Sequence, residues 1–205
     1  MLELYTSGTT NGLRAAVMSE ESGLPFKAHR LNLPAGDQKK PDYLKLNPSG
    51  RIPTLVDPQA AGGPLVLSQS VAIILYLAEK SGKLWPKDGA ARARALEWAM
   101  FQATDVSPRY GVTFFLLNGA AEKQPVAAGY LQAQMKNFYR LYDQQLASNA
   151  YLAGAEYSFA DVVAYASTAM AGRVGVALDE FANLKRWLAQ VAERPAVKRG
   201  MAVMG

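Results

Sequence analysis

Two short segments carry groups suited to binding a small peptide-like anion. The first reads Asn-Pro-Ser-Gly-Arg-Ile-Pro-Thr-Leu-Val-Asp over residues 47–57, and the second, Leu-Ser-Gln-Ser-Val-Ala-Ile, begins at Leu67. Pro53 opens an apolar run, residues 54–56, that we expect to be a strand, because proline is tolerated at the first residue of a strand. The backbone beside Pro53 could therefore pair with an extended peptide in the manner of an added strand.

The second segment predicts a helix N-terminus. Ser68 precedes apolar residues at helical spacing, namely Val71, Ile74, Leu75, Leu77 and Ala78. We therefore expect Ser68 to be the N-cap, with Gln69 and Ser70 in the first turn. The unpaired N–H groups and partial positive charge of such a terminus suit a carboxylate, which the Ser70 hydroxyl and amide could bind.

A third set of polar side chains lies between the first expected strand, residues 2–5, and the first expected helix. It comprises Thr9, Thr10 and Asn11, followed by Gly12. This position is at the carboxyl end of a strand, where binding sites of α/β folds usually form. Thr9 and Asn11 could alternatively do no more than cap the helix.

Together these segments resemble the glutathione-binding half of the cytosolic glutathione transferase superfamily. The resemblance implies a cis Ile52–Pro53 bond and a Gln69-Ser70 pair that holds the γ-glutamyl end of glutathione. It also implies ligand contacts from Gln38 and Arg51, although by composition Gln38 is a loop residue and Arg51 could equally face solvent. The resemblance covers essentially the whole chain, including the linker-like Gly-Lys-Leu-Trp-Pro at residues 82–86 and the folding motif Ser-Phe-Ala-Asp at residues 158–161.

The sulfur-side residues are closest to the serine/threonine-type classes. The pattern Tyr5-x-x-x-Thr9-x-Asn11-Gly12 resembles the bacterial Nu-type and fungal nitrogen-regulator-like branch, in which a Thr and an Asn flank the sulfur. That branch is associated with disulfide reduction by bound glutathione. Because the chain contains no cysteine, the ligand must supply the thiol, and the beta- and omega-type mechanisms are excluded. Tyr5 is the rival thiol activator, but it falls within the strand pattern, so we favour Thr9.

The resemblance and the periodicity imply an α/β plus all-α protein. Residues 1–80 would form a thioredoxin-like domain, residues 81–90 a linker and residues 91–205 an all-helical domain. Within the first, we expect a hairpin of residues 54–56 and 65–67. Within the last, helices are expected over residues 91–117 with a bend at Pro108, 125–148, 159–171 and 182–194, followed by a short one.

Composition argues against several other classes of protein. The net charge is +5, of which residues 1–80 hold only +1, and no run of like charge occurs, so a nucleic-acid partner is not expected. No apolar stretch reaches the roughly 18 residues of a membrane span, and no signal precedes the first strand, so we expect a cytoplasmic protein without membrane contact. The lack of cysteine excludes disulfides and cysteine metal sites, and no metal is expected.

The function expected from the resemblance is glutathione transfer to a small hydrophobic electrophile, glutathione-dependent disulfide reduction, or both. Glutathione would be a cosubstrate, no prosthetic group is expected, and the protein would be a homodimer. Tyr110 and Phe114 are candidates for the acceptor pocket, although helical aromatics more often belong to the core. The alternative is a non-catalytic glutathione transferase-like binding or regulatory protein.

Overall fold

The computed structural model describes residues 1–203, which form two compact units. The first comprises Met1–Trp85 together with the described residues from Arg194 onward, and the second comprises Pro86–Glu193. The division into residues 1–80, 81–90 and 91–205 stays a prediction about domains. The units differ from it in one respect, because the last helix belongs with the first unit.

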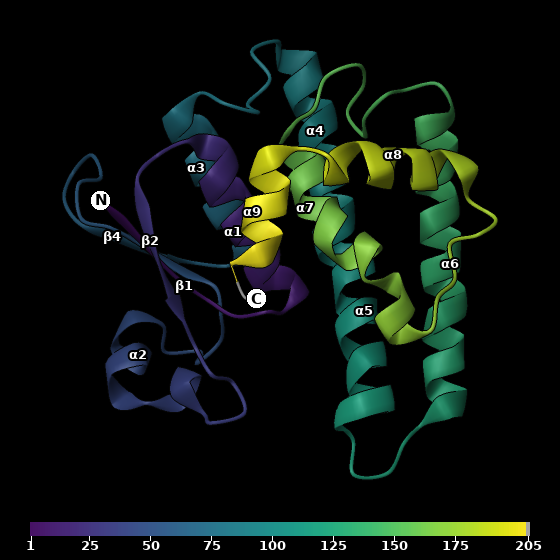
Figure 1. The fold of residues 1–205 in the computed structure, drawn as a ribbon, viewed down its shortest axis with the longest axis horizontal. Coiled ribbons are helices and arrows are strands. Elements are labelled where there is room, and N and C mark those ends of the chain that lie inside the picture. The colour runs from purple at the N-terminus through teal and green to yellow at the C-terminus, as the bar shows by residue number, and fades with distance from the viewer. Residues whose placement is uncertain (204–205) are drawn as a thin grey trace. The chain divides into compact units, whose positions relative to one another are not determined.

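The first unit is built on a four-stranded mixed sheet (Figure 1). Its strands are β1 (Leu2–Thr6), β2 (Phe26–Arg30), β3 (Thr54–Asp57) and β4 (Leu65–Ser68), in the spatial order β2-β1-β3-β4. β1 and β2 are parallel, whereas β3 is antiparallel to both of its neighbours. The predicted strands and hairpin are confirmed, and the arrangement is the thioredoxin-like one that was expected.

Four α-helices and one 3-10 turn accompany the sheet. They are α1 (Thr10–Ser22), η1 (Asp37–Lys39), α2 (Pro41–Leu46), α3 (Ser70–Ser81) and α9 (Pro195–Ala202). Alternate β1 residues, Leu2 and Leu4, are buried on the face that α1 covers. Tyr5, which points to the other face, lies 6.0 Å from Tyr43 of α2, so α2 lies on the opposite side of the sheet.

Helix α9 completes the first unit by packing on α1 (Figure 1). A Cβ on Gly200 would lie only 2.5 Å from the Cα of Val17, so the two helices touch where the side chain is missing. Arg194 donates two hydrogen bonds to the buried carboxylate of Glu21, at 2.7 and 2.8 Å. The end of the chain is therefore bound to its beginning by both packing and charge.

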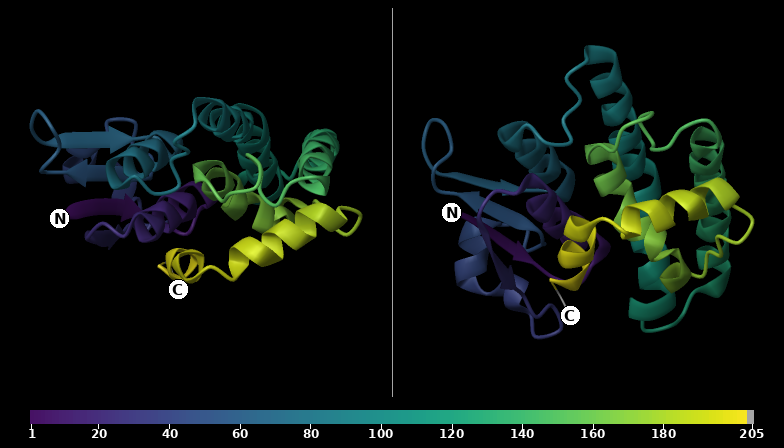
Figure 2. Two further views of the ribbon diagram at one scale, coloured as in Figure 1. Left: turned by 90° about the horizontal axis from the view of Figure 1, so that it is seen from above. Right: turned by 45° about the horizontal axis from the view of Figure 1, so that its top comes forward.

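The second unit consists of helices only. They are α4 (Gly89–Phe101), the π-helical η2 (Gln102–Val106), α5 (Ser107–Phe114), the π-helical η3 (Phe115–Gly119), α6 (Pro125–Ala147), α7 (Phe159–Ala169), the 3-10 turn η4 (Ala171–Val174) and α8 (Ala182–Ala192). The predicted helices are confirmed in outline, and α5 and α6 pack side by side (Figures 1 and 2). No helix within residues 1–203 is long and apolar enough to cross a membrane.

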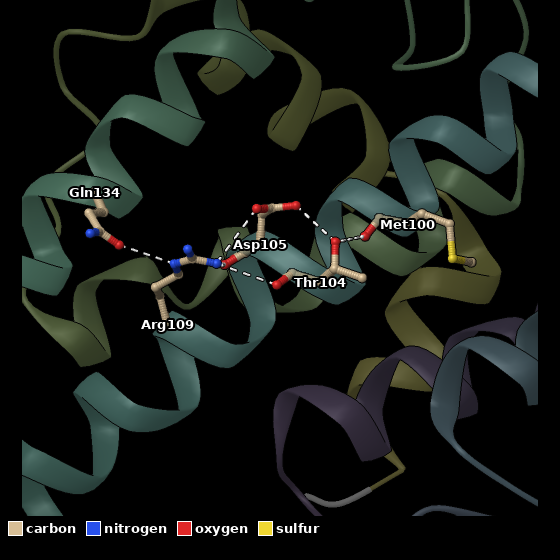
Figure 3. Close-up of polar contacts among 5 residues, drawn as sticks. All are labelled: Met100, Thr104, Asp105, Arg109 and Gln134. Atoms are coloured by element: carbon tan, nitrogen blue, oxygen red, sulfur yellow. Dashed lines mark hydrogen bonds and ion pairs between the residues drawn. The ribbon is translucent and has the colours of Figure 1, made fainter.

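The helix expected over residues 91–117, with a bend at Pro108, is interrupted by the π-helical turn η2, which ends at Val106, two residues before Pro108. Proline has no N–H with which to continue the α-helical ladder, so carbonyls in the preceding turn lose a donor. Arg109 donates from Nη1 to the carbonyls of Thr104 and Asp105, at 3.4 and 3.0 Å, and from Nε to Gln134 of α6, at 3.1 Å (Figure 3). Arg109 thus supports the irregular turn and ties it to the neighbouring helix.

The motif at residues 158–161 forms a capping box at the start of α7. The Ser158 hydroxyl accepts from the N–H of Ala160, and Asp161 Oδ2 accepts from the Ser158 N–H at 2.9 Å. Asp161 is fully buried, and its Oδ1 also accepts from the Leu152 N–H and from Trp187 Nε1. Asp161 is therefore a structural residue that joins the start of α7 to α8.

Candidate functional site

Four segments of the chain meet at one edge of the sheet. In the register, Tyr5 of β1 lies opposite Thr54 of β3, and Thr54 lies opposite Ser68 of β4. Thr6 at the end of β1 lies opposite Arg30 at the end of β2. The loop after β1, the loop after β2, the residues before β3 and the residues after β4 therefore begin at the same edge. These segments contain every glutathione-side residue predicted from the sequence.

The helix after β4 begins one residue later than predicted. Ser68 was expected to be the N-cap of the following helix, and this is wrong: Ser68 is the last residue of β4, held extended by its pairing with Thr54. Gln69 stands at the N-cap with φ 74° and ψ 114°, and α3 begins at Ser70. A residue other than glycine in such a conformation costs about 1 to 3 kcal/mol, and such strain clusters at ligand sites.

Ser70 and Gln69 both lie at the start of α3. Ser70 is 8 % exposed, and within the described residues its hydroxyl makes no hydrogen bond. Gln69 is exposed at the same turn. The N-terminus of α3 thus presents a hydroxyl, an amide side chain and unpaired backbone N–H groups, which together could bind a carboxylate.

The loop before β3 contains the predicted cis bond, between Ile52 and Pro53. The carbonyl of Arg51, just before it, accepts hydrogen bonds from the Tyr43 hydroxyl at 2.6 Å and from Asn47 Nδ2 at 2.7 Å. The Arg51 side chain itself is exposed. Neither Tyr43 nor Asn47 was among the predicted site residues, although an Asn-Pro-Ser-Gly stretch is a signal for a side chain that bonds the backbone of its own loop.

Gln38 lies in η1, on the loop after β2. A Cβ on Gly50, which has φ +59°, would lie 3.0 Å from the Gln38 carbonyl oxygen, so the two loops are in contact. This contact places the main chain of Gln38 next to the residue that precedes Arg51. The loop that carries Gln38 therefore contacts the loop that carries Arg51 and Pro53.

Thr9 and Asn11 lie at the start of α1. Thr9 is the N-cap, and its Oγ1 accepts a hydrogen bond from the N–H of Gly12 at 3.2 Å. A Cβ on Gly12 would lie 2.1 Å from the Ser7 carbonyl oxygen, so only glycine lets the loop after β1 fold against the helix. Asn11 is exposed, and its Oδ1 accepts from Arg14 Nη2 at 2.6 Å.

Tyr5, the rival to Thr9, is used elsewhere. Its ring stacks on His29 with centroids 4.5 Å apart, and its hydroxyl donates to Glu3 Oε2 at 3.1 Å. Burial, and then the Glu3 carboxylate, raise the pKa of Tyr5. Its side chain lies on the sheet face that carries α2, beside Tyr43. The assignment of Thr9 rather than Tyr5 to the thiol stays a prediction. The stacking on Tyr5 also gives His29, the only histidine in the sequence, a structural partner.

The two acceptor-pocket candidates in the second unit have different surroundings. Tyr110 is buried and donates its hydroxyl proton to the Met170 carbonyl at 3.1 Å, as a core residue does. Phe114 is 41 % exposed, next to the exposed Phe115. A role for either in an acceptor pocket stays a prediction, and Phe114 has the surface exposure that such a role needs.

Two family models match the chain, one in each half. Residues 10–80 match the N-terminal domain of glutathione S-transferase, and residues 106–195 match its C-terminal domain. Two curated relatives come from Escherichia coli. The disulfide-bond oxidoreductase YfcG is 30% identical over 98% of this chain and 94% of its own length, and the disulfide-bond oxidoreductase YghU is 32% identical over 98% and 74%.

Solved structures of bacterial glutathione transferases have the same fold. The enzyme from Burkholderia graminis, with two glutathione molecules bound per subunit, superposes with a TM-score of 0.92 at 34% identity over 98% of this chain and 88% of that one. The enzyme from Pseudomonas putida, with one glutathione disulfide per subunit, gives 0.92 at 33% identity over 100% and 92%. The chain belongs to the glutathione S-transferase family.

Proposed function

We propose that this protein binds glutathione at the sheet edge described above and uses its thiolate to reduce disulfides. The observation that carries the proposal is the convergence of Thr9, Pro53 and the Gln69-Ser70 pair at one edge, set by the strand register. In this arrangement the N-terminus of α3 holds the γ-glutamyl carboxylate, and the backbone beside Pro53 pairs with the cysteinyl peptide unit. The remaining side of the proposed glutathione site is lined by Ile52, Gln38 and Arg51.

Thr9 and Asn11 would act on the sulfur. A hydroxyl has one proton to donate and two lone pairs, so Thr9 can accept from the Gly12 N–H and still donate to a thiolate. The start of α1 adds the partial positive charge of a helix N-terminus. These groups favour the charged form of a thiol whose pKa is about 8.5 when free.

Disulfide reduction is favoured over conjugation because of the relatives and their ligands. Two relatives carry the name disulfide-bond oxidoreductase, one similar structure holds two glutathione molecules per subunit, and another holds glutathione disulfide. The chain itself contains no cysteine, so both electrons must come from glutathione. Conjugation to a small hydrophobic electrophile is the second chemistry that the same thiolate supports.

The proposed reaction balances without another reductant. The bound glutathione thiolate attacks one sulfur of the substrate disulfide, whose S–S bond breaks and releases the first thiol. A second glutathione thiolate then attacks the resulting mixed disulfide at the glutathione sulfur, releasing the second thiol and glutathione disulfide. The two protons lost by the glutathione thiols end on the two product thiols.

The test is retention on immobilised glutathione, followed by parallel assays with a hydroxyethyl disulfide and an aryl halide. We expect retention, glutathione-dependent reduction of the disulfide and slower conjugation of the aryl halide. Retention without either activity would instead support the non-catalytic binding protein, and absence of retention would contradict the site. A homodimer is part of the proposal, and light scattering at micromolar concentration checks it: the mass of one 22.1 kDa chain would contradict it.

A further inference from the structure

Arg14 is a charged side chain in an unusual place. It lies in the second turn of α1, is 1 % exposed, and is among the largest fully buried side chains of the protein. Arginine is almost never fully buried unless its guanidinium is paired, because removing the charge from water is costly. Its position on this helix therefore calls for an explanation in terms of its partners.

One partner is the side chain of Asn11, one turn earlier on the same helix. Arg14 Nη2 donates to Asn11 Oδ1 at 2.6 Å, a short, charge-assisted hydrogen bond between residues three apart. A guanidinium has only donors, so the atom of Asn11 that faces it must be the oxygen. The Nδ2 amide group of Asn11 then points the other way, and within residues 1–203 it makes no hydrogen bond.

We propose that Arg14 is a positioning residue that orients Asn11 so that its Nδ2 group donates to the sulfur of bound glutathione. Without Arg14, the amide of the exposed Asn11 could rotate and present its oxygen, an acceptor that repels a thiolate. The buried guanidinium also withdraws electron density through the Oδ1 hydrogen bond, which strengthens the opposite Nδ2 donor. This inference rests on the proposed function, because it concerns the same thiolate.

The decisive experiment is a double-mutant cycle with Arg14→Met and Asn11→Ala, read out as the pH titration of the bound glutathione thiolate by its ultraviolet absorbance. Each single variant should reduce the thiolate-to-thiol ratio at neutral pH about tenfold, with turnover falling in proportion and glutathione affinity changing much less. Adding Arg14→Met to Asn11→Ala should have no further effect, since Arg14 acts through Asn11. Additive losses, or an unchanged titration in Arg14→Met, would overturn the proposal.

A second variant covers the case in which Arg14→Met does not fold. Asn11→Asp keeps an acceptor for Arg14 but replaces the amide donor by a negative charge. The thiol of bound glutathione should then have a pKa at or above that of free glutathione. In the unaltered protein, the Nδ2 protons of Asn11, identified by their loss in Asn11→Asp, should shift in the NMR spectrum when glutathione is added. A wild-type titration in Asn11→Asp, or Nδ2 protons insensitive to glutathione, would refute the role.

These outcomes are separable from failure of the proposed function. If the unaltered protein binds no glutathione, the proposed function is wrong. If it binds glutathione as thiolate and the Arg14 and Asn11 variants leave that thiolate unchanged, only the positioning role is wrong.

Discussion

Thr9 Oγ1 accepts a hydrogen bond from the N–H of Gly12 at 3.2 Å, so one hydroxyl caps α1 and still has its proton to donate. The sequence left open whether Thr9 is a helix cap or a thiol-stabilising residue, and the geometry makes the two roles compatible. A cap fixes the hydroxyl at the helix start, which is where a donor to a thiolate is needed. The capping hydrogen bond would therefore help Thr9 to donate its own hydrogen bond to the thiolate.

The first prediction concerns carboxylate binding at α3. If the Ser70 hydroxyl donates to the γ-glutamyl carboxylate, Ser70→Ala removes one charge-assisted hydrogen bond worth about 1.5 to 3 kcal/mol, and glutathione affinity falls roughly ten- to a hundredfold. Titration calorimetry measures this. Ser68→Ala is the matched control, since Ser68 belongs to β4, and its affinity should stay near that of the wild type. If Ser70→Ala binds glutathione as tightly as Ser68→Ala does, Ser70 does not bind the carboxylate.

The second prediction follows from the backbone of Gln69. Glycine adopts a φ of 74° without strain, so Gln69→Gly should melt at or above the wild-type temperature, even though glycine adds freedom to the unfolded chain. Gln69→Ala keeps the strain and is the control. Both variants lose the side-chain amide and should bind glutathione less tightly. A lower melting temperature for Gln69→Gly than for Gln69→Ala, by calorimetry, would show that the strain at Gln69 is smaller than the cost of the freedom that glycine adds to the unfolded chain.

The third prediction is a pH dependence of stability at the far end of β3. Burial alone would raise the pKa of Asp57, but hydrogen bonds from Lys80, Tyr76 and the Gln59 N–H outweigh it and hold the pKa below its usual range. A lowered folded-state pKa stabilises the protein above the ordinary carboxyl pKa of about 3.9, and this contribution disappears as the pH falls through the folded-state value.

Asp57→Asn should therefore melt a few degrees below the wild type at pH 7, and the gap should narrow below about pH 4. Asp42→Asn is the matched control, because the Asp42–Lys45 pair is solvent-exposed and worth little. Thermal unfolding followed by circular dichroism across this pH range measures both. A gap that stays constant from pH 7 to pH 3 would exclude the ionised carboxylate as its cause.

Much of the first unit could be predicted because its signals are local. The strand expected at residues 2–5, the proline before β3 and the possible cap of α1 at Thr9 each depend on residues a few positions apart, and the structure has all three. The capping box of α7 is local in the same way. The start of α3 was misplaced because Ser68 is a good cap by type, whereas its pairing with Thr54, a contact between strands, keeps it extended.

Other features depend on contacts between distant residues and have no local signature. The hydrogen bonds that hold the Arg51 carbonyl come from Tyr43 and Asn47, which the pattern alone would leave as a helix residue and a loop residue. The return of α9 to α1 depends on Gly200 meeting Val17 across the fold. The hydrogen bond from Arg14 to Asn11 is local, yet the burial of Arg14 is visible only in three dimensions.

The central claim, that Thr9 at the sheet edge holds glutathione as a thiolate, is tested most directly by titrating the bound thiol in the wild type, Thr9→Ala and Tyr5→Phe. In the wild type the thiol should titrate clearly below the free value of about 8.5. Thr9→Ala should move it back toward that value and lower turnover roughly ten- to a thousandfold, whereas Tyr5→Phe should change little. Loss of the thiolate in Tyr5→Phe together with its retention in Thr9→Ala would contradict the account.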